Sequence, residues 1–312
     1  MRIICTARSY AAVLTFFGVV RSSNVESGEG QAQSLSHLQQ VNSSHALPQM
    51  RKRAMNRPQE NHLLSSLCQT DLQALLPYLE AVDLPLRYPL EIPHKPVCHA
   101  YFLTSGIGSV VAGSGDHDME AGIVGRDGMT GTAIVLIASQ GPNKTCMQIA
   151  GRGLRIMAAQ LFGEMEKRPT IRHCLLRYAF AFHVQITQTL VANSRAKLDA
   201  RLARWLLMAH DRLDGDTITL THEFLSRMLG VRRAGITTTV RCLQDQGCVR
   251  AHSGFITIID RAPLERIAAP YYGIPEREQL RLTGWESRNS GELIHKLHET
   301  TSLKSTIADI SS

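Results

Sequence analysis

The sequence predicts an α+β protein with an antiparallel β-roll, one long helix and a C-terminal winged helix-turn-helix unit. Three observations support this prediction. Glycine and proline recur at close intervals between residues 85 and 156 and separate short apolar stretches. Residues 170–214 contain neither glycine nor proline. Between residues 221 and 259, two short amphipathic helices are followed by a strand, a turn and a second strand.

The composition fits a folded protein of about two domains. The chain has 312 residues, of which 44% are hydrophobic and 20% charged, which excludes a wholly disordered chain and a fibre. Its net charge of +7 suits a polyanionic partner without requiring one. The seven cysteines are scattered, and no two of them are separated by two residues. This pattern argues against a disulfide scaffold or a metal site and favours a reducing cytoplasm.

Residues 1–60 form an N-terminal extension without sustained periodicity. Arg2 and Arg8 precede an apolar run over residues 11–20, which is too short to span a bilayer and is not followed by a small-x-small cleavage site. We therefore expect no membrane association. The extension is expected to be disordered, or to precede a true translation start at Met50 or Met55.

Residues 61–167 carry the strand pattern of the roll. Apolar stretches at Ala100–Leu103, Ser109–Ala112, Ala133–Ala138 and Cys146–Ile149 are expected to be short strands. An alternative is a cupin-like metalloenzyme with His117 and Glu120 as ligands, but a His-x-His pair and a second ligand motif are missing. No hydrolase or P-loop motif occurs either. We therefore expect neither an enzyme nor a bound metal.

Residues 168–196 are expected to form a helix that pairs with another copy of the chain. Ala158–Lys167 forms a short helix, and Pro169 starts the next at a position where its missing N–H costs little. The predicted seam has a spacing of three and four residues and comprises Leu176, Ala179, His183, Ile186 and Leu190. A homodimer follows from this seam. The alternative is a helix buried inside a monomer.

Residues 197–270 read as a winged helix-turn-helix. Thr221 is a suitable N-cap for a helix that stops at Gly230, and a second helix follows over about residues 232–246. Such a second helix enters the major groove of DNA. The residues expected to contact DNA are Arg232, Arg233, Thr237 and Thr238 on this helix, with His222 and His252 placed for the phosphate backbone of the DNA.

Residues 202–211 and 224–233 resemble the Crp/Fnr superfamily of bacterial transcription regulators. The resemblance implies a cyclic-nucleotide-binding-like β-roll, a dimerisation helix and a winged helix that binds a two-fold symmetric operator in double-stranded DNA, with RNA polymerase as a further partner. It also implies that Arg233 contacts guanine and that Thr221, His222 and His252 contact phosphate. Ala234 and Thr238 depart from members that carry Glu and Arg there, so the operator sequence cannot be carried over.

The resemblance is weaker at the expected effector pocket. The residues that match the family's phosphate-binding stretch are Gly125, Gly128, Gly131, Thr132, Lys144 and Thr145. Thr132 replaces a carboxylate and Lys144 replaces an arginine, which predicts weakened cyclic AMP binding and leaves any cofactor open. The alternative is that residues 125–131 are only a turn of the roll.

Two further expectations complete the prediction. Residues 271–312 are expected to form a C-terminal tail, of which residues 285–312 are mostly polar. The remaining functional alternative is a protein-interaction module whose winged helix binds DNA without sequence preference.

Overall fold

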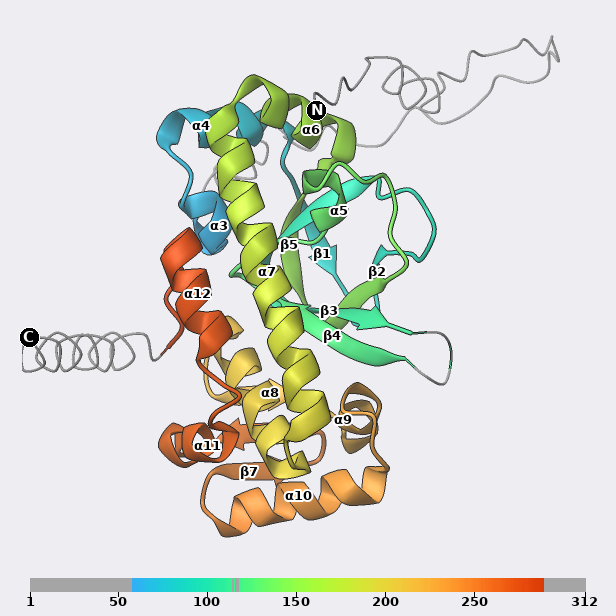
Figure 1. The fold of residues 1–312 in the computed structure, drawn as a ribbon, viewed down its shortest axis with the longest axis vertical. Helices are drawn as coiled ribbons and strands as arrows, with labels where there is room; N and C mark the ends of the chain where they lie inside the picture. Colours follow the sequence, from blue (N-terminus) through green and yellow to red (C-terminus); the bar gives the residue numbers. More distant parts are fainter. Residues whose placement is uncertain (1–57, 114, 116–117, 289–312) are drawn as a thin grey trace, which may run out of the picture. The chain divides into compact units, whose positions relative to one another are not determined.

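The computed structural model describes residues 58–113, 115 and 118–288. Residues 1–57 of the N-terminal extension, both candidate start methionines and His117 lie outside these ranges. The predicted order of roll, long helix and winged helix-turn-helix is confirmed (Figure 1). None of the helices in the described ranges has the length and hydropathy that a bilayer span requires.

The roll is an antiparallel sheet dominated by two long strands. Its strands are β1 (Glu80–Leu84), β2 (Pro89–Glu91), β3 (His99–Ala112), β4 (Met119–Val124) and β5 (Lys144–Met157), in the order β1-β5-β3-β4 with β2 on β5. The predicted short strands over residues 100–112 are thus one strand of 14 residues. This strand bends at register shifts such as the one next to Gly106, where φ is +77° and a Cβ would lie 2.5 Å from the Ile149 carbonyl oxygen.

One predicted strand is wrong. Ala133–Ala138 was expected to be extended, but residues 132–135 form helix α5 (Thr132–Val135), which follows Gly131 in the left-handed conformation. Ile134 and Val135 bury their side chains in the roll. A short apolar run has the same composition in a buried strand and a buried helix turn, so periodicity could not distinguish them.

Helices cover the roll and extend from it. The shorter ones are η1 (Pro58–Glu60), α3 (His62–Ser65), α4 (Gln69–Leu75), η2 (Leu76–Tyr78) and α6 (Ala158–Lys167). They precede α7 (Pro169–Arg195), whose 27 residues start at Pro169 as predicted. Ile171, Leu175, Tyr178 and Phe182 of α7 are buried in one hydrophobic core with the inner face of the roll. This packing fixes one face of α7 on its own roll.

The C-terminal part has a second hydrophobic core. It is built from α8 (Leu198–Arg212), β6 (Thr217–Thr219), α9 (His222–Met228), α10 (Arg233–Asp245), β7 (Val249–His252), β8 (Phe255–Ile258) and α11 (Arg261–Ala268). The strands form a small sheet in the order β6-β8-β7. Ile107 and Ile123 of the roll belong to this second core. The outer face of the roll and α8 therefore share apolar contacts.

The expected C-terminal tail is wrong for residues 274–288. Residues 274–283 form α12 (Ile274–Thr283), which packs against α7 (Figure 1). Trp285 is 2% exposed, with its ring 5.2 Å from the Arg212 guanidinium carbon. Gln279 Nε2 donates to the Asp127 backbone oxygen at 3.3 Å. The expectation failed because the buried contacts of this polar segment are mostly hydrogen bonds and ring contacts, which leave no apolar periodicity.

We predict that Gly128→Ala destabilises the fold. A Cβ at residue 128 would lie 2.2 Å from the Tyr178 hydroxyl oxygen. Tyr178 cannot give way, because its ring is 1% exposed and its hydroxyl donates to the Met129 carbonyl oxygen at 2.9 Å. We expect the free energy of unfolding, measured by urea titration, to fall by about 1–3 kcal/mol. The matched control is Gly141→Ala, where a Cβ meets nothing within 4 Å. Equal stability of the two variants would contradict the close packing.

Candidate nucleic-acid interface

Helices α9 and α10 form a helix-turn-helix with a closed inner face. The Thr221 side chain accepts a hydrogen bond from the Phe224 backbone N–H at 3.2 Å, so the predicted N-cap is confirmed. Gly230 forms the turn with φ +61°. Ile236, Val240 and Leu243 of α10 are all buried at 1% exposure or less. Because these three residues face the core, the opposite face of α10 faces the solvent.

The exposed face of α10 carries the predicted DNA-contacting residues. Arg232 precedes the helix as its N-cap residue, Arg233 is its first residue, and both are exposed together with Thr237 and Thr238. His222 Nδ1 lies 3.1 Å from Thr237 Oγ1. The structure thus brings His222, at the start of α9, onto the surface of α10. Guanidinium donors at the open end of a helix can reach base edges in a groove.

The wing contributes a second exposed edge. His252 is exposed at the end of β7, and the turn into β8 runs through Ser253 and Gly254 in the left-handed region, with φ +39° and +85°. The sequence reasoning missed two exposed arginines, Arg241 on α10 and Arg250 on β7. Arg241 lies four residues after Thr237, so helical spacing was a signal that could have placed it on the same face.

The glycine-rich residues of the predicted effector pocket are packed against helices. Gly125, Gly128 and Gly131 are all buried. A Cβ at Gly125 would lie 2.7 Å from the Arg212 Cβ, and one at Gly128 would overlap Tyr178. Asp127, between them, forms a 2.8 Å ion pair with Arg212 of α8. These glycines let α7 and α8 approach the loop closely, so residues 125–128 link the roll to the helix-turn-helix part.

The Glu91 side chain occupies two hydrogen-bond donors of the predicted effector pocket. Glu91 Oε1 accepts from the Gly131 backbone N–H at 2.9 Å, and the Thr145 side chain also hydrogen-bonds to this carboxylate. Burial raises the pKa of Glu91, while the two hydrogen bonds lower it. Thr132 is half-buried and Lys144 is exposed. A phosphate that needed the Gly131 and Thr145 donors would have to displace Glu91.

The exposed stripe of α7 contains three of the five residues of the predicted seam. Leu176, His183 and Leu190 are exposed as expected, but Ala179 is 8% exposed in the core of its own roll, and Ile186 is half-buried against that core. Phe180, which is 52% exposed, lies on the outward stripe instead. Packing on the roll therefore decides which apolar residues of α7 remain exposed.

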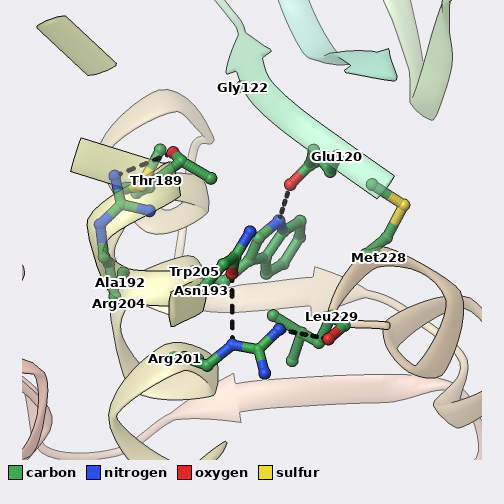
Figure 2. Close-up of a pocket in the computed structure, with 11 residues that line it drawn as sticks. Glu120, Gly122, Thr189, Ala192, Asn193, Arg201, Arg204, Trp205, Met228 and Leu229 are labelled. Carbon is green, nitrogen blue, oxygen red and sulfur yellow. Dashed lines mark hydrogen bonds between the residues drawn. The ribbon is translucent and has the colours of Figure 1, made fainter. Parts of the chain in front are cut away.

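A fully buried carboxylate joins the roll to α8. Glu120 of β4 accepts from Ser109 Oγ at 2.6 Å. It also accepts from Trp205 Nε1 of α8 at 2.6 Å (Figure 2). Burial raises its pKa to about 7, although the two hydrogen bonds lower it. Glu120 therefore holds the two parts together instead of lining an open metal site. Among the described residues, no group of three or more His, Cys, Asp or Glu side chains could hold a metal ion.

The comparisons agree with this geometry. The family model for the Crp-like helix-turn-helix domain matches residues 200–267, which contain α9, α10 and the wing. This part of the chain is a Crp-like helix-turn-helix domain. In sequence, no curated protein matches the chain.

Two solved structures are similar in fold to about two thirds of this chain. One is a transcriptional regulator of the Crp/Fnr family from Eubacterium rectale, with 17% identity and a TM-score of 0.53 over 67% of this chain and 99% of that one. The other is the cyclic-di-GMP-responsive global regulator CLP of Xanthomonas campestris, with 15% identity and a TM-score of 0.51 over 62% of this chain and 100% of that one. The chain has the fold of the Crp/Fnr superfamily, and the predicted resemblance is confirmed.

We predict that Glu120 makes stability depend on pH. Its pKa of about 7 in the folded protein exceeds the ordinary value of 4.5, so between these values the folded state holds a proton that the unfolded chain has released. The free energy of unfolding of the wild type should therefore fall as pH rises from 5 to 8. Glu120→Gln lacks the titrating carboxyl, so its free energy of unfolding should fall less over the same range, by on the order of 2 kcal/mol. Urea titrations at each pH measure this difference.

The exposed Glu166→Gln serves as the control and should keep the pH dependence of wild type. Parallel stability curves for wild type and Glu120→Gln would contradict the raised pKa.

Proposed function

We propose that this protein is a sequence-specific DNA-binding transcription regulator. The observation that carries the proposal is the exposed amino-terminal end of α10. There Arg232 and Arg233 are exposed, whereas the inner face of the helix is buried. Both lie within the segment that matches the Crp-like helix-turn-helix model. Arg233 is assigned to a guanine, where its fork matches the O6 and N7 acceptors. Thr221, His222 and His252 are assigned to phosphates, and Thr237 and Thr238 to base edges or phosphate.

We further propose that the regulator is a homodimer held by α7. The exposed residues Leu176, Phe180, His183, Leu190 and Ser194 lie four, three, seven and four positions apart, so they follow one face of the helix, with the half-buried Thr187 in the gap. Leu190 is 69% exposed and Phe180 52% exposed, which leaves apolar surface for a partner helix. A parallel pair of α7 helices would place two winged helices on successive major grooves about 34 Å apart. A contact with RNA polymerase and a cytoplasmic location stay predictions.

We predict that Arg233→Ala weakens binding to the operator about 10- to 100-fold, because one good arginine–guanine pair contributes about 1–3 kcal/mol. Fluorescence anisotropy on the operator and on random DNA measures the effect. The loss should be larger on the operator, whereas His252→Ala should weaken both about equally. Equal losses of Arg233→Ala on both DNAs would contradict the assignment of Arg233 to a base.

We predict that Leu190→Glu dissociates the homodimer. Each dimer loses two apolar contacts and gains two facing carboxylates, so the dimer Kd should rise about 100-fold or more. Analytical ultracentrifugation measures the change. The matched control is Leu136→Glu, because Leu136 is a leucine of similar exposure, 61%, that follows α5 and is not part of α7. If Leu190→Glu remains as dimeric as this control, the α7 stripe is not the dimer interface.

The first test of the function is a selection of bound genomic fragments with the full chain. A pseudo-palindromic motif with two half-sites supports both DNA reading and the homodimer. Salt-sensitive binding without a motif would overturn the proposal and favour the interaction module with non-specific DNA binding.

A further inference from the structure

The link between α7 and α8 does not by itself fix the angle between these helices. It consists of Ala196, with φ −82° and ψ +145°, and Lys197, with φ −64° and ψ +161°. Both residues are extended, and small rotations at such element-terminal residues move everything that follows. The orientation of the helix-turn-helix relative to α7 is therefore set by packing outside the link, which includes side-chain contacts that α8 makes across it.

One face of α8 supplies these contacts. Arg201, Arg204 and Trp205 are three and four positions apart, so they share a face. We call them the brace residues, and each donates a hydrogen bond to a group on the other side of the link (Figure 2). Trp205 reaches Glu120, as described above. Arg204, which is 5% exposed, donates through Nη2 to Thr189 Oγ1 of α7 at 3.2 Å and through Nε to the Tyr271 carbonyl oxygen at 2.9 Å.

Arg201 differs from the other two brace residues because it contacts α7 and the helix-turn-helix together. Its Nε donates to Asn193 Oδ1 of α7 at 3.2 Å, and its Nη2 donates to the Leu229 carbonyl oxygen. Leu229 is the C-cap of α9. The last carbonyls of a helix lack intrahelical partners and carry the negative end of its dipole, so a guanidinium is well suited to this position.

The turn that Arg201 reaches leads directly into the recognition helix α10. Gly230 follows Leu229, and a Cβ at Gly230 would lie 3.0 Å from Met119 Cε of the roll. Asn193, the partner of Arg201, also donates through Nδ2 to the Met119 sulfur at 3.4 Å. The end of α7, the start of β4 and the turn before α10 therefore meet around the Arg201 guanidinium.

We propose that Arg201 is a positioning residue for DNA recognition, which fixes the angle of each helix-turn-helix to α7 and thereby the separation of the two recognition helices. This inference rests on the proposed function, a homodimer on two half-sites. In a two-fold symmetric dimer, a rotation at each α7–α8 link changes the distance between the two recognition helices, and half-site spacing follows that distance.

The experiment measures affinity for DNAs that carry two identical half-sites separated by a varied number of base pairs. We expect wild type to have one sharp optimum. In Arg201→Ala, the ratio of affinities between the best spacing and one changed by two base pairs should fall about tenfold, the size expected for lost charge-assisted hydrogen bonds. Affinity for a single half-site should change far less. Arg201→Lys, which keeps a donor for the Leu229 carbonyl, should restore part of the selectivity.

Arg201 is suited to this test because it is only half-buried. It lines a small cavity of about 20 Å³, which is about the volume that one water needs. Truncation of its side chain therefore enlarges an existing cavity. Asn193→Ala breaks the same contact from α7 and serves if Arg201→Ala does not fold. The charge control is Arg266→Ala, which removes an exposed arginine of the same domain and should leave the spacing optimum unchanged.

The outcomes separate the two proposals. If wild type binds two half-sites with a sharp optimum, and both Arg201→Ala and Asn193→Ala keep the wild-type selectivity, the positioning role is overturned while the proposed function stands. If wild type recognises no half-site at all, the proposed function fails, and the positioning role fails with it.

Discussion

The buried ion pair between Asp127 and Arg212 is the contact on which the arrangement of the two cores depends. Its atoms are 2.8 Å apart, and the side chains are only 2% and 1% exposed. Burial disfavours the charge of Arg212, but Asp127, Asp211 and Glu276 together raise its pKa, so the guanidinium stays charged. A buried charge is tolerable only when it is paired and hydrogen-bonded. The Gly125 backbone N–H, which donates to Asp127 at 2.8 Å, helps to meet that condition.

The same ion pair explains why the glycine-rich loop has its sequence. Gly125 leaves room for the Arg212 side chain, and Gly128 leaves room for Tyr178. At the far end of this loop, Gly131 donates to Glu91. One segment of seven residues therefore contacts α8 at its start and a buried carboxylate at its end. A ligand that moved Glu91 would act on a loop that is directly bonded to the first helix of the DNA-binding part.

The sequence predicted the elements whose signals are local. Pro169, Thr221 and Gly230 mark helix boundaries where the structure has them, because capping and turn chemistry depend on neighbouring residues. The prediction failed where tertiary packing decides, as in α5 and in the burial of Ala179 against its own roll. It could not find the bond between Glu120 and Trp205, which are 85 positions apart, or the contact of Arg201 with Leu229. Such pairs leave no periodicity in a single sequence.

Helix α12 changes the mechanical character of the DNA-binding part. That part leaves α7 through Ala196 and Lys197, and the chain returns through α12 to pack on α7 again, with Gln279 bonded to Asp127 of the roll. The DNA-binding part is therefore tied to α7 and the roll where the chain enters it and again where the chain leaves it, in addition to the contacts of α8 with the roll.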